Sequence, residues 1–136
     1  MIVLFDTVRR HKPVREAGEL VAVRWESKEL LRTIPLFPDE PAIDDDPNPR
    51  GNSRGGKGIA ARGDEIFVGT YHTVLLFDRN LALRRRMTNY LFVNVHEIHP
   101  VAEGLWVSST AIDCALLVDA AGRTLRTFWP REQPLL

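Results

Sequence analysis

The chain has 136 residues, of which 44% are hydrophobic, so it has the length and apolar content of one domain with a real core. Eighteen basic and eighteen acidic residues cancel, which argues against a nucleic acid or an anionic membrane as partner. The single cysteine, Cys114, excludes an internal disulfide and fits a reducing compartment.

No targeting or membrane segment is indicated by the pattern of apolar and charged residues. The apolar run at the N-terminus is too short for a signal peptide, and its charges follow it instead of preceding it. No run reaches the length of a membrane span. We therefore expect a soluble cytoplasmic protein.

Residues 1–37 predict the strands of a first, partial blade. Ile2 to Phe5 form an apolar run closed by Asp6; it is either a first strand or an outer strand that completes another blade. Residues 20–25 and 30–37 predict a hairpin, although a short helix over residues 26–32 stays open as an alternative.

Residues 38–56 change abruptly in composition, with four prolines, three glycines and a run of aspartates. Proline lacks the amide donor, and glycine tolerates a positive φ, so no regular ladder is expected here. The rigid proline steps favour a loop folded across one face of the protein over a flexible linker.

Residues 57–89 and 90–130 each predict four short strands, rich in Val, Leu, Ile and Trp and separated by Gly and Asp turns. We place the strands at residues 58–61, 65–70, 73–78 and 83–87, and then at 93–99, 105–109, 115–119 and 124–129. Residues 131–136 form a tail.

The two four-strand units are copies of one pattern. Ile66, Phe67 and Val68 align with Leu105, Trp106 and Val107, and the LLFD and LLVD endings align as well. A repeat of about 40 residues with four strands per copy is typical of a β-propeller blade. An ordinary β-sandwich or meander is the alternative.

The predicted fold is therefore all-β, with about three propeller-type blades of antiparallel strands. Closed propellers usually have at least four blades, so this chain is half of a ring. We expect homodimerisation to complete it, because open sheet edges otherwise favour aggregation.

The channel of such a ring is lined by the first strand of each blade, which selects candidate site residues. In the glycine-rich segment RGNSRGGKG, Arg54 and Lys57 stand beside amides that suit an anionic group. A tight glycine turn is the alternative, and the segment is not a Walker A motif. The dense basic run Arg84 to Arg86 predicts a solvated sheet edge.

Three further candidates are His72, in a loop between strands, and His96 and Glu97, in the first strand of the third blade. Strand alternation predicts that Glu97 and His99 share one face, with His96 and Ile98 on the other. Glu97 is the best single candidate for a channel site, since a buried carboxylate needs a partner. No nucleophile elbow or HExxH motif occurs.

Residues 56–130 resemble blades of the six-bladed propellers of the NHL and SMP-30/gluconolactonase-like kind, through GIAARGDEIFVGTYHTVLLFD and GLWVSSTAIDCALLVDAAG. Lactonase-like members of that group bind a divalent cation in the channel through Glu, Asn and Asp. The resemblance carries this role over to Glu97 and Asn94 alone.

Three functional hypotheses follow. The first is a binding or assembly module that self-associates and takes a small anionic ligand or a peptide at the channel mouth, without a cofactor. The second is a metal-dependent hydrolase of lactonase or esterase type, with a divalent cation at Glu97 and a histidine as base. The third is a fragment of a longer propeller that lacks a complete site.

Overall fold

The computed structural model describes residues 1–8, 18–37 and 55–132, and the sites predicted for residues 38–54 lie outside this part. Within the described ranges the chain forms three antiparallel sheets and a short 3-10 helix, Pro130–Glu132. The first sheet contains β1 (Ile2–Val8), β2 (Gly18–Arg24) and β3 (Glu29–Pro35); the second contains β4 (Gly58–Arg62), β5 (Glu65–Gly69), β6 (Thr73–Asp78) and β7 (Leu83–Thr88); the third contains β8 (Val95–Val101), β9 (Gly104–Ser109), β10 (Cys114–Val118) and β11 (Thr124–Phe128). No helix in these ranges is long and apolar enough to cross a membrane.

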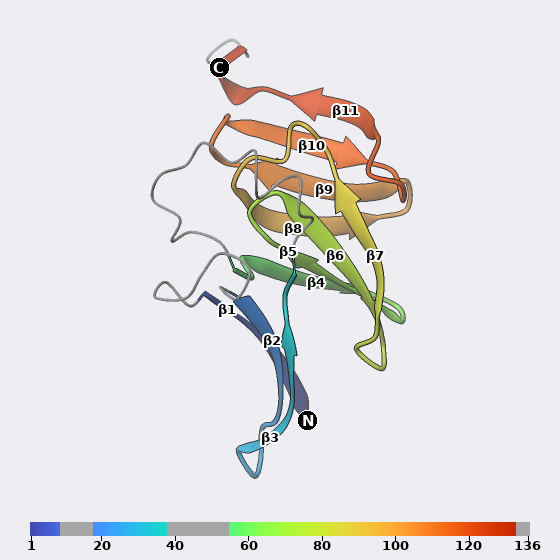
Figure 1. The fold of residues 1–136 in the computed structure, drawn as a ribbon. Helices are drawn as coiled ribbons and strands as arrows, with labels where there is room; N and C mark the ends of the chain where they lie inside the picture. The colour runs from blue at the N-terminus through green and yellow to red at the C-terminus, as the bar shows by residue number, and fades with distance from the viewer. Residues whose placement is uncertain (9–17, 38–54, 133–136) are drawn as a thin grey trace.

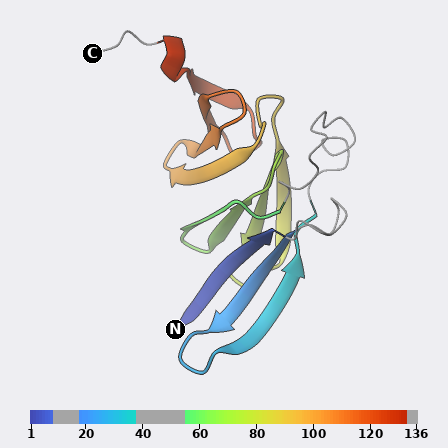
Figure 2. The ribbon, with the colours of Figure 1, turned by 90° about the vertical axis from the view of Figure 1, so that its left-hand side faces the viewer.

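The three sheets stack in chain order, each rotated relative to the last, as blades do (Figures 1 and 2). In the second and third sheets the strands pair in sequence, so that β4 and β8 are the innermost strands and β7 and β11 the outermost. The predicted all-β architecture of antiparallel propeller-type blades is confirmed. The segment predicted as either a turn or a helix after residue 25 is a turn followed by β3, with Lys28 at a φ of 57°.

The repeated aspartates at the ends of β6 and β10 organise the outer hairpins. Asp78 accepts hydrogen bonds from the amides of Asn80 and Ala82 (2.8 and 2.9 Å) and pairs with Arg84. Asp119 does the same in the third sheet, with the amide and the side chain of Arg123. The LLFD and LLVD endings are therefore turn motifs with a hydrogen-bonding role.

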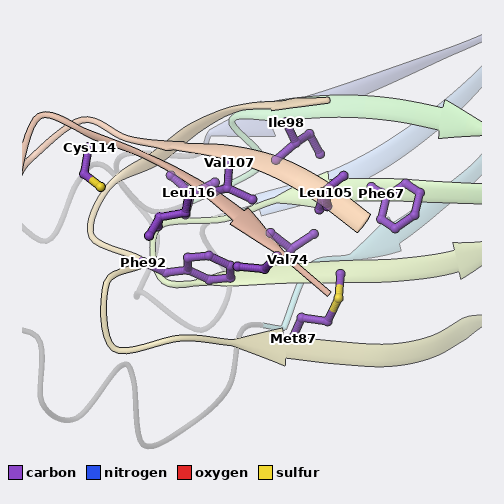
Figure 3. Packing of buried hydrophobic residues seen from close by; sticks show 11 residues of the cluster. Phe67, Val74, Met87, Phe92, Ile98, Leu105, Val107, Cys114 and Leu116 are labelled. Carbon is purple, nitrogen blue, oxygen red and sulfur yellow. The ribbon is translucent and has the colours of Figure 1, made fainter. Parts of the chain in front are cut away.

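Two apolar cores hold the stack together, one at each junction between sheets. Leu4, Leu20 and Ala22 of the first sheet pack against Val68, Leu75 and Phe77 of the second. The opposite face of the second sheet packs against the third (Figure 3), through Phe67, Val74, Leu76, Met87, Ile98, Leu105, Val107 and Leu116. Cys114 is buried in this second core, in accordance with a packing role.

Arginines on the outer strands join each sheet to the next. Arg32 of β3 donates to the carbonyl of Asn80 (2.6 Å), in the β6–β7 turn. Arg85 of β7 donates to the carbonyl of Ala120, in the equivalent β10–β11 turn, and Arg86 donates back to Phe37. The basic run Arg84 to Arg86 is exposed on the outermost strand β7, as predicted. Arg85 and Arg86 also contact neighbouring segments, whereas Arg84 pairs with Asp78 of its own sheet.

In the described residues the first sheet has three strands, one fewer than each of the other two sheets. Asp6 of β1 pairs with Leu20, as Gly69 of β5 pairs with Val74 and Ser108 of β9 pairs with Ala115. The contact of β3 with the next turn matches that of β7. Thus β1, β2 and β3 correspond to the second, third and fourth strands of the other sheets. In the described part of the chain, no strand pairs with the other edge of β1.

Candidate functional site

The loops at one end of the stack bring together a polar group that we call the mouth cluster: Lys57, Tyr71, His72, Asn94 and Thr110. Lys57 precedes β4, Asn94 precedes β8, and the other three follow β5 and β9. The ammonium group of Lys57 donates to Oδ1 of Asn94 and lies 5.1 Å from the centre of the Tyr71 ring. Burial lowers the pKa of Lys57, although its contact with the ring favours the cation.

Hydrogen bonds hold both ends of the Asn94 side chain and its backbone carbonyl in this cluster. Its φ is 59°, a conformation that asparagine tolerates better than most residues. Its Nδ2 donates to Oγ1 of Thr110 (2.6 Å), and the Thr110 hydroxyl donates to the Asn94 carbonyl (2.9 Å). The Asn94 side chain is therefore engaged at both ends, with Oδ1 accepting from Lys57 and Nδ2 donating to Thr110.

The glycine-rich segment before β4 does not form an anion cradle in its described part. The amide of Gly56 donates to the Thr7 carbonyl (3.0 Å), and the amide of Lys57 donates to the Gly69 carbonyl (2.8 Å). The Gly58 backbone lies near the Asp6 carboxylate and opposes the rise of its pKa. The Gly56 amide joins the second sheet to the first, and the Lys57 amide extends the pairing of β4 with β5. The Lys57 side chain is the group of this described part that suits an anion. Arg54 lies outside the described residues.

A β-bulge places both His96 and Glu97 on the exposed side of β8. The pairing with β9 shifts between Val95 and Ile98, and both of these residues are buried. His96, Glu97 and His99 are all exposed, so the predicted alternation of faces is wrong at this point. The Glu97 amide donates to Oγ of Ser108 (2.8 Å), which holds the bulge.

Asp6 is a residue of this region that sequence reasoning did not select as a site. Its Oδ2 is buried and has no hydrogen-bond partner. Burial raises the pKa of Asp6, and the nearby charge of Glu97 raises it further. The sequence signal was the ending of the run IVLFD, which suggested a strand end; in the structure, Asp6 lies inside β1.

These residues form two adjoining groups along the innermost strands. Lys57 and His72 lie in the mouth cluster, linked through Tyr71, whose ring is 4.4 Å from that of His72 in an edge contact. Glu97 lies beside Gly58, the residue that follows Lys57. Among the described residues, no three His, Cys, Asp or Glu side chains gather as a metal site.

A shallow groove of about 410 Å³ adjoins the mouth cluster on the third sheet. Ser108, Thr110 and Cys114 contribute to its walls, and an ion pair between Asp113 and Arg131 lies at its rim. The groove borders the outward face of the third sheet, because Ser108 and Ala115 belong to both.

Comparison with known proteins identifies the fold and no more. No family model and no curated protein matches this chain. Among solved structures, the chain is similar to Sqt1 of Saccharomyces cerevisiae, a WD40-type β-propeller protein, with a TM-score of 0.64 at 12% sequence identity. The match covers 93% of this chain and 30% of the Sqt1 chain. It supports propeller-type blades, and it does not support the NHL or gluconolactonase kind.

Proposed function

We propose that this chain is a propeller-type assembly module that self-associates through the outward faces of its first and third sheets. The observation that carries the proposal is that these faces repeat the apolar positions by which the sheets already pack on one another. Unpartnered apolar sheet faces in a repeat architecture call for a further repeat or a cap.

The outward face of the third sheet matches the face by which the second sheet holds the third. Trp106 and Leu117 are a cross-strand pair, as Phe67 and Leu76 are in the second sheet. Phe128 pairs with Ala115 on the same face and is 46% exposed. Phe67 and Leu76 pack into the core shared with the third sheet. By analogy the half-buried Trp106 and the exposed Phe128 are placed to receive another blade, beside Leu117, which is already buried.

The outward face of the first sheet matches the face that the second sheet turns towards the first. Val3, Phe5, Val21 and Val23 lie on the side of the sheet opposite to the core residues Leu4 and Ala22. The Phe5 ring lies 6.5 Å from that of Trp25, and both side chains are over 40% exposed. By position, this face fits the outward face of a third sheet.

The partner that supplies such a face is a second copy of this chain. A contact between the first sheet of one copy and the third sheet of another is head-to-tail, and two copies related by a twofold axis would form two such contacts and a ring of six blades. Each contact joins sheet faces of the kind that form the two internal cores. The longer Sqt1 chain is consistent with a ring larger than three blades.

Light scattering on the wild type and on charged-face variants tests this assembly. We expect a mass of twice 15.4 kDa for the wild type and a monomer for Phe5→Lys and for Phe128→Glu. Tyr90→Lys is the matched control, because Tyr90 is 86% exposed and lies in a loop.

Mixing the two monomeric variants tests the head-to-tail geometry. One contact in the mixed pair then has both wild-type faces, and the other opposes Lys to Glu, so we expect the dimer to return. A wild type that stays monomeric at high concentration would overturn the assembly. If the wild type dimerises and the mixture of variants stays monomeric, the head-to-tail geometry is wrong.

The ligand of the assembly is proposed to bind at the mouth cluster, as a small anion or an acidic side chain of a peptide. The half-buried ammonium group of Lys57 supports an anionic partner, because a desolvated cation gains from a charged acceptor. Titration with inorganic phosphate, followed by amide shifts, should move Thr110 in the wild type and not in Lys57→Met. The metal-dependent hydrolase has less support, because no three His, Cys, Asp or Glu side chains gather in the part of the chain that the structure describes.

A further inference from the structure

We propose that the free edge of β1 takes up an extended segment of another polypeptide, which completes the first sheet as its innermost strand. The inference goes beyond the assembly proposed above, because it concerns the edge of a sheet and not its faces. It holds whether or not two copies associate.

The first observation is the place of the missing strand. In the other two sheets, β5 and β9 each pair on their inner side with β4 and β8. β1 corresponds to β5 and β9 by register, yet in the described ranges its inner side pairs with no strand; at its C-terminal end the Thr7 carbonyl already accepts the Gly56 amide. An edge strand offers a row of unpaired amides and carbonyls to an incoming strand.

The second observation is an acceptor without a donor. In the third sheet, Oγ of Ser108 accepts the Glu97 amide of the innermost strand β8. Asp6 holds the equivalent position of the first sheet, and its Oδ2 is buried with no partner. An orphaned buried acceptor next to an absent strand indicates that the strand would supply the donor.

The third observation concerns the width of the vacant place. Gly58 of β4 has its Cα so close to the His96 carbonyl that a Cβ would lie 2.4 Å from this oxygen. Adjacent innermost strands therefore touch backbone to backbone. By analogy, the position on the other side of β4, next to β1, has room for a single extended segment and not for a second sheet. That segment would need a small residue where its backbone meets β4.

The charges around the vacant place favour a basic segment. Burial is the main cause that raises the pKa of Asp6, and the charge of Glu97 adds a smaller contribution, so a Lys or Arg of the segment would be attracted to both carboxylates. By the pattern of the other sheets, the segment would run antiparallel to β1. Backbone pairing would provide affinity, and the small and basic residues would provide selectivity.

The probe is a capped, fluorescent peptide with the sequence of residues 57–62, KGIAAR, which is the innermost strand of the second sheet with its preceding lysine. We expect saturable binding by anisotropy and slower hydrogen exchange at the amides of β1. A control peptide with proline at the position of Ala60 lacks one amide donor, and we expect it to bind about tenfold more weakly or not at all.

Two protein variants make the result specific. In one, residues 57–64 replace Met1 directly before Ile2, because Ile2 corresponds to Glu65, which follows the β4–β5 turn. This tethered strand should abolish binding of the free peptide. The other, Phe128→Glu, carries its change on the third sheet and should bind the peptide like the wild type even if it no longer dimerises.

Equal affinity for the two peptides, or no change in exchange along β1, would overturn the proposal. Protection of β1 in the free protein that rises with protein concentration would also overturn it, because a second copy would then occupy the edge. If the tethered variant fails to fold, the affinities of the two peptides for the wild-type protein still test the proposal.

Discussion

Replacing Gly58 by alanine should destabilise the protein through the contact between the two innermost strands. The added Cβ would lie 2.4 Å from the His96 carbonyl, far inside van der Waals contact. Both sides of this contact are backbone, so no side-chain rotation relieves it and β4 must move away from β8. Overpacking of this kind costs about 1–3 kcal/mol.

Urea unfolding of Gly58→Ala and Gly69→Ala compares two glycines that pair across β4 and β5. A Cβ at Gly69 would lie 3.1 Å from Cγ1 of Val95, a side chain that can shift. Replacing glycine by alanine in a strand also reduces unfolded-state entropy, and this gain is the same for both variants. We therefore expect Gly69→Ala to lose less than about 1 kcal/mol.

Equal losses in the two variants would refute the backbone contact as the reason for Gly58. A Gly58→Ala variant of unchanged stability that binds inorganic phosphate more weakly than the wild type would support the other interpretation of the glycine-rich segment, in which it serves an anion.

Three further outcomes are expected. Asp6→Asn should be more stable than the wild type at neutral pH, because burial raises the pKa of Asp6 and its charge opposes folding above the ordinary value of 3.8; thermal melts from pH 3 to pH 8 should show this difference vanish in acid, and a constant difference would contradict the cause. Asp78→Asn should be less stable than the wild type at neutral pH, because the Ala82 amide and Arg84 lower the pKa of Asp78; its deficit should shrink as the pH falls through the lowered pKa, and a pH-independent deficit would count against the ion pair. Arg85→Met should lose about 0.5–1.5 kcal/mol in urea unfolding through its bond to Ala120, whereas Arg79→Met, at a 72% exposed side chain, is the neutral control.

The blades of the second half of the chain were predictable because their signals are local. Alternating apolar residues and Gly or Asp turns place strands without knowledge of the partner strand, and the repeated LLFD and LLVD endings are fixed by hydrogen bonds within one hairpin. The all-β, propeller-type class follows from these two features.

The features that were not predicted depend on pairing between distant segments. Alternation failed at His96 and Glu97 because a bulge inserts residues without any mark in the apolar pattern. The role of Asp6 was missed because it depends on which strand of a blade β1 forms. The pairing of β1 with β2 decides this, and the sequence of β1 alone does not show it. Arg85 appeared to be a surface cation, since its acceptor lies 35 residues away.

The arginine contacts between the outer hairpins also bear on how the protein unfolds. Each sheet is bound mainly to its neighbours in the chain, so the stack behaves as a linear array in which stability spreads by nearest-neighbour coupling. The second sheet has a partner on both sides, and the first and third have one each. Opening of a single, unassociated copy should therefore begin at the two ends of the array, with the slowest-exchanging amides on β5 and β6.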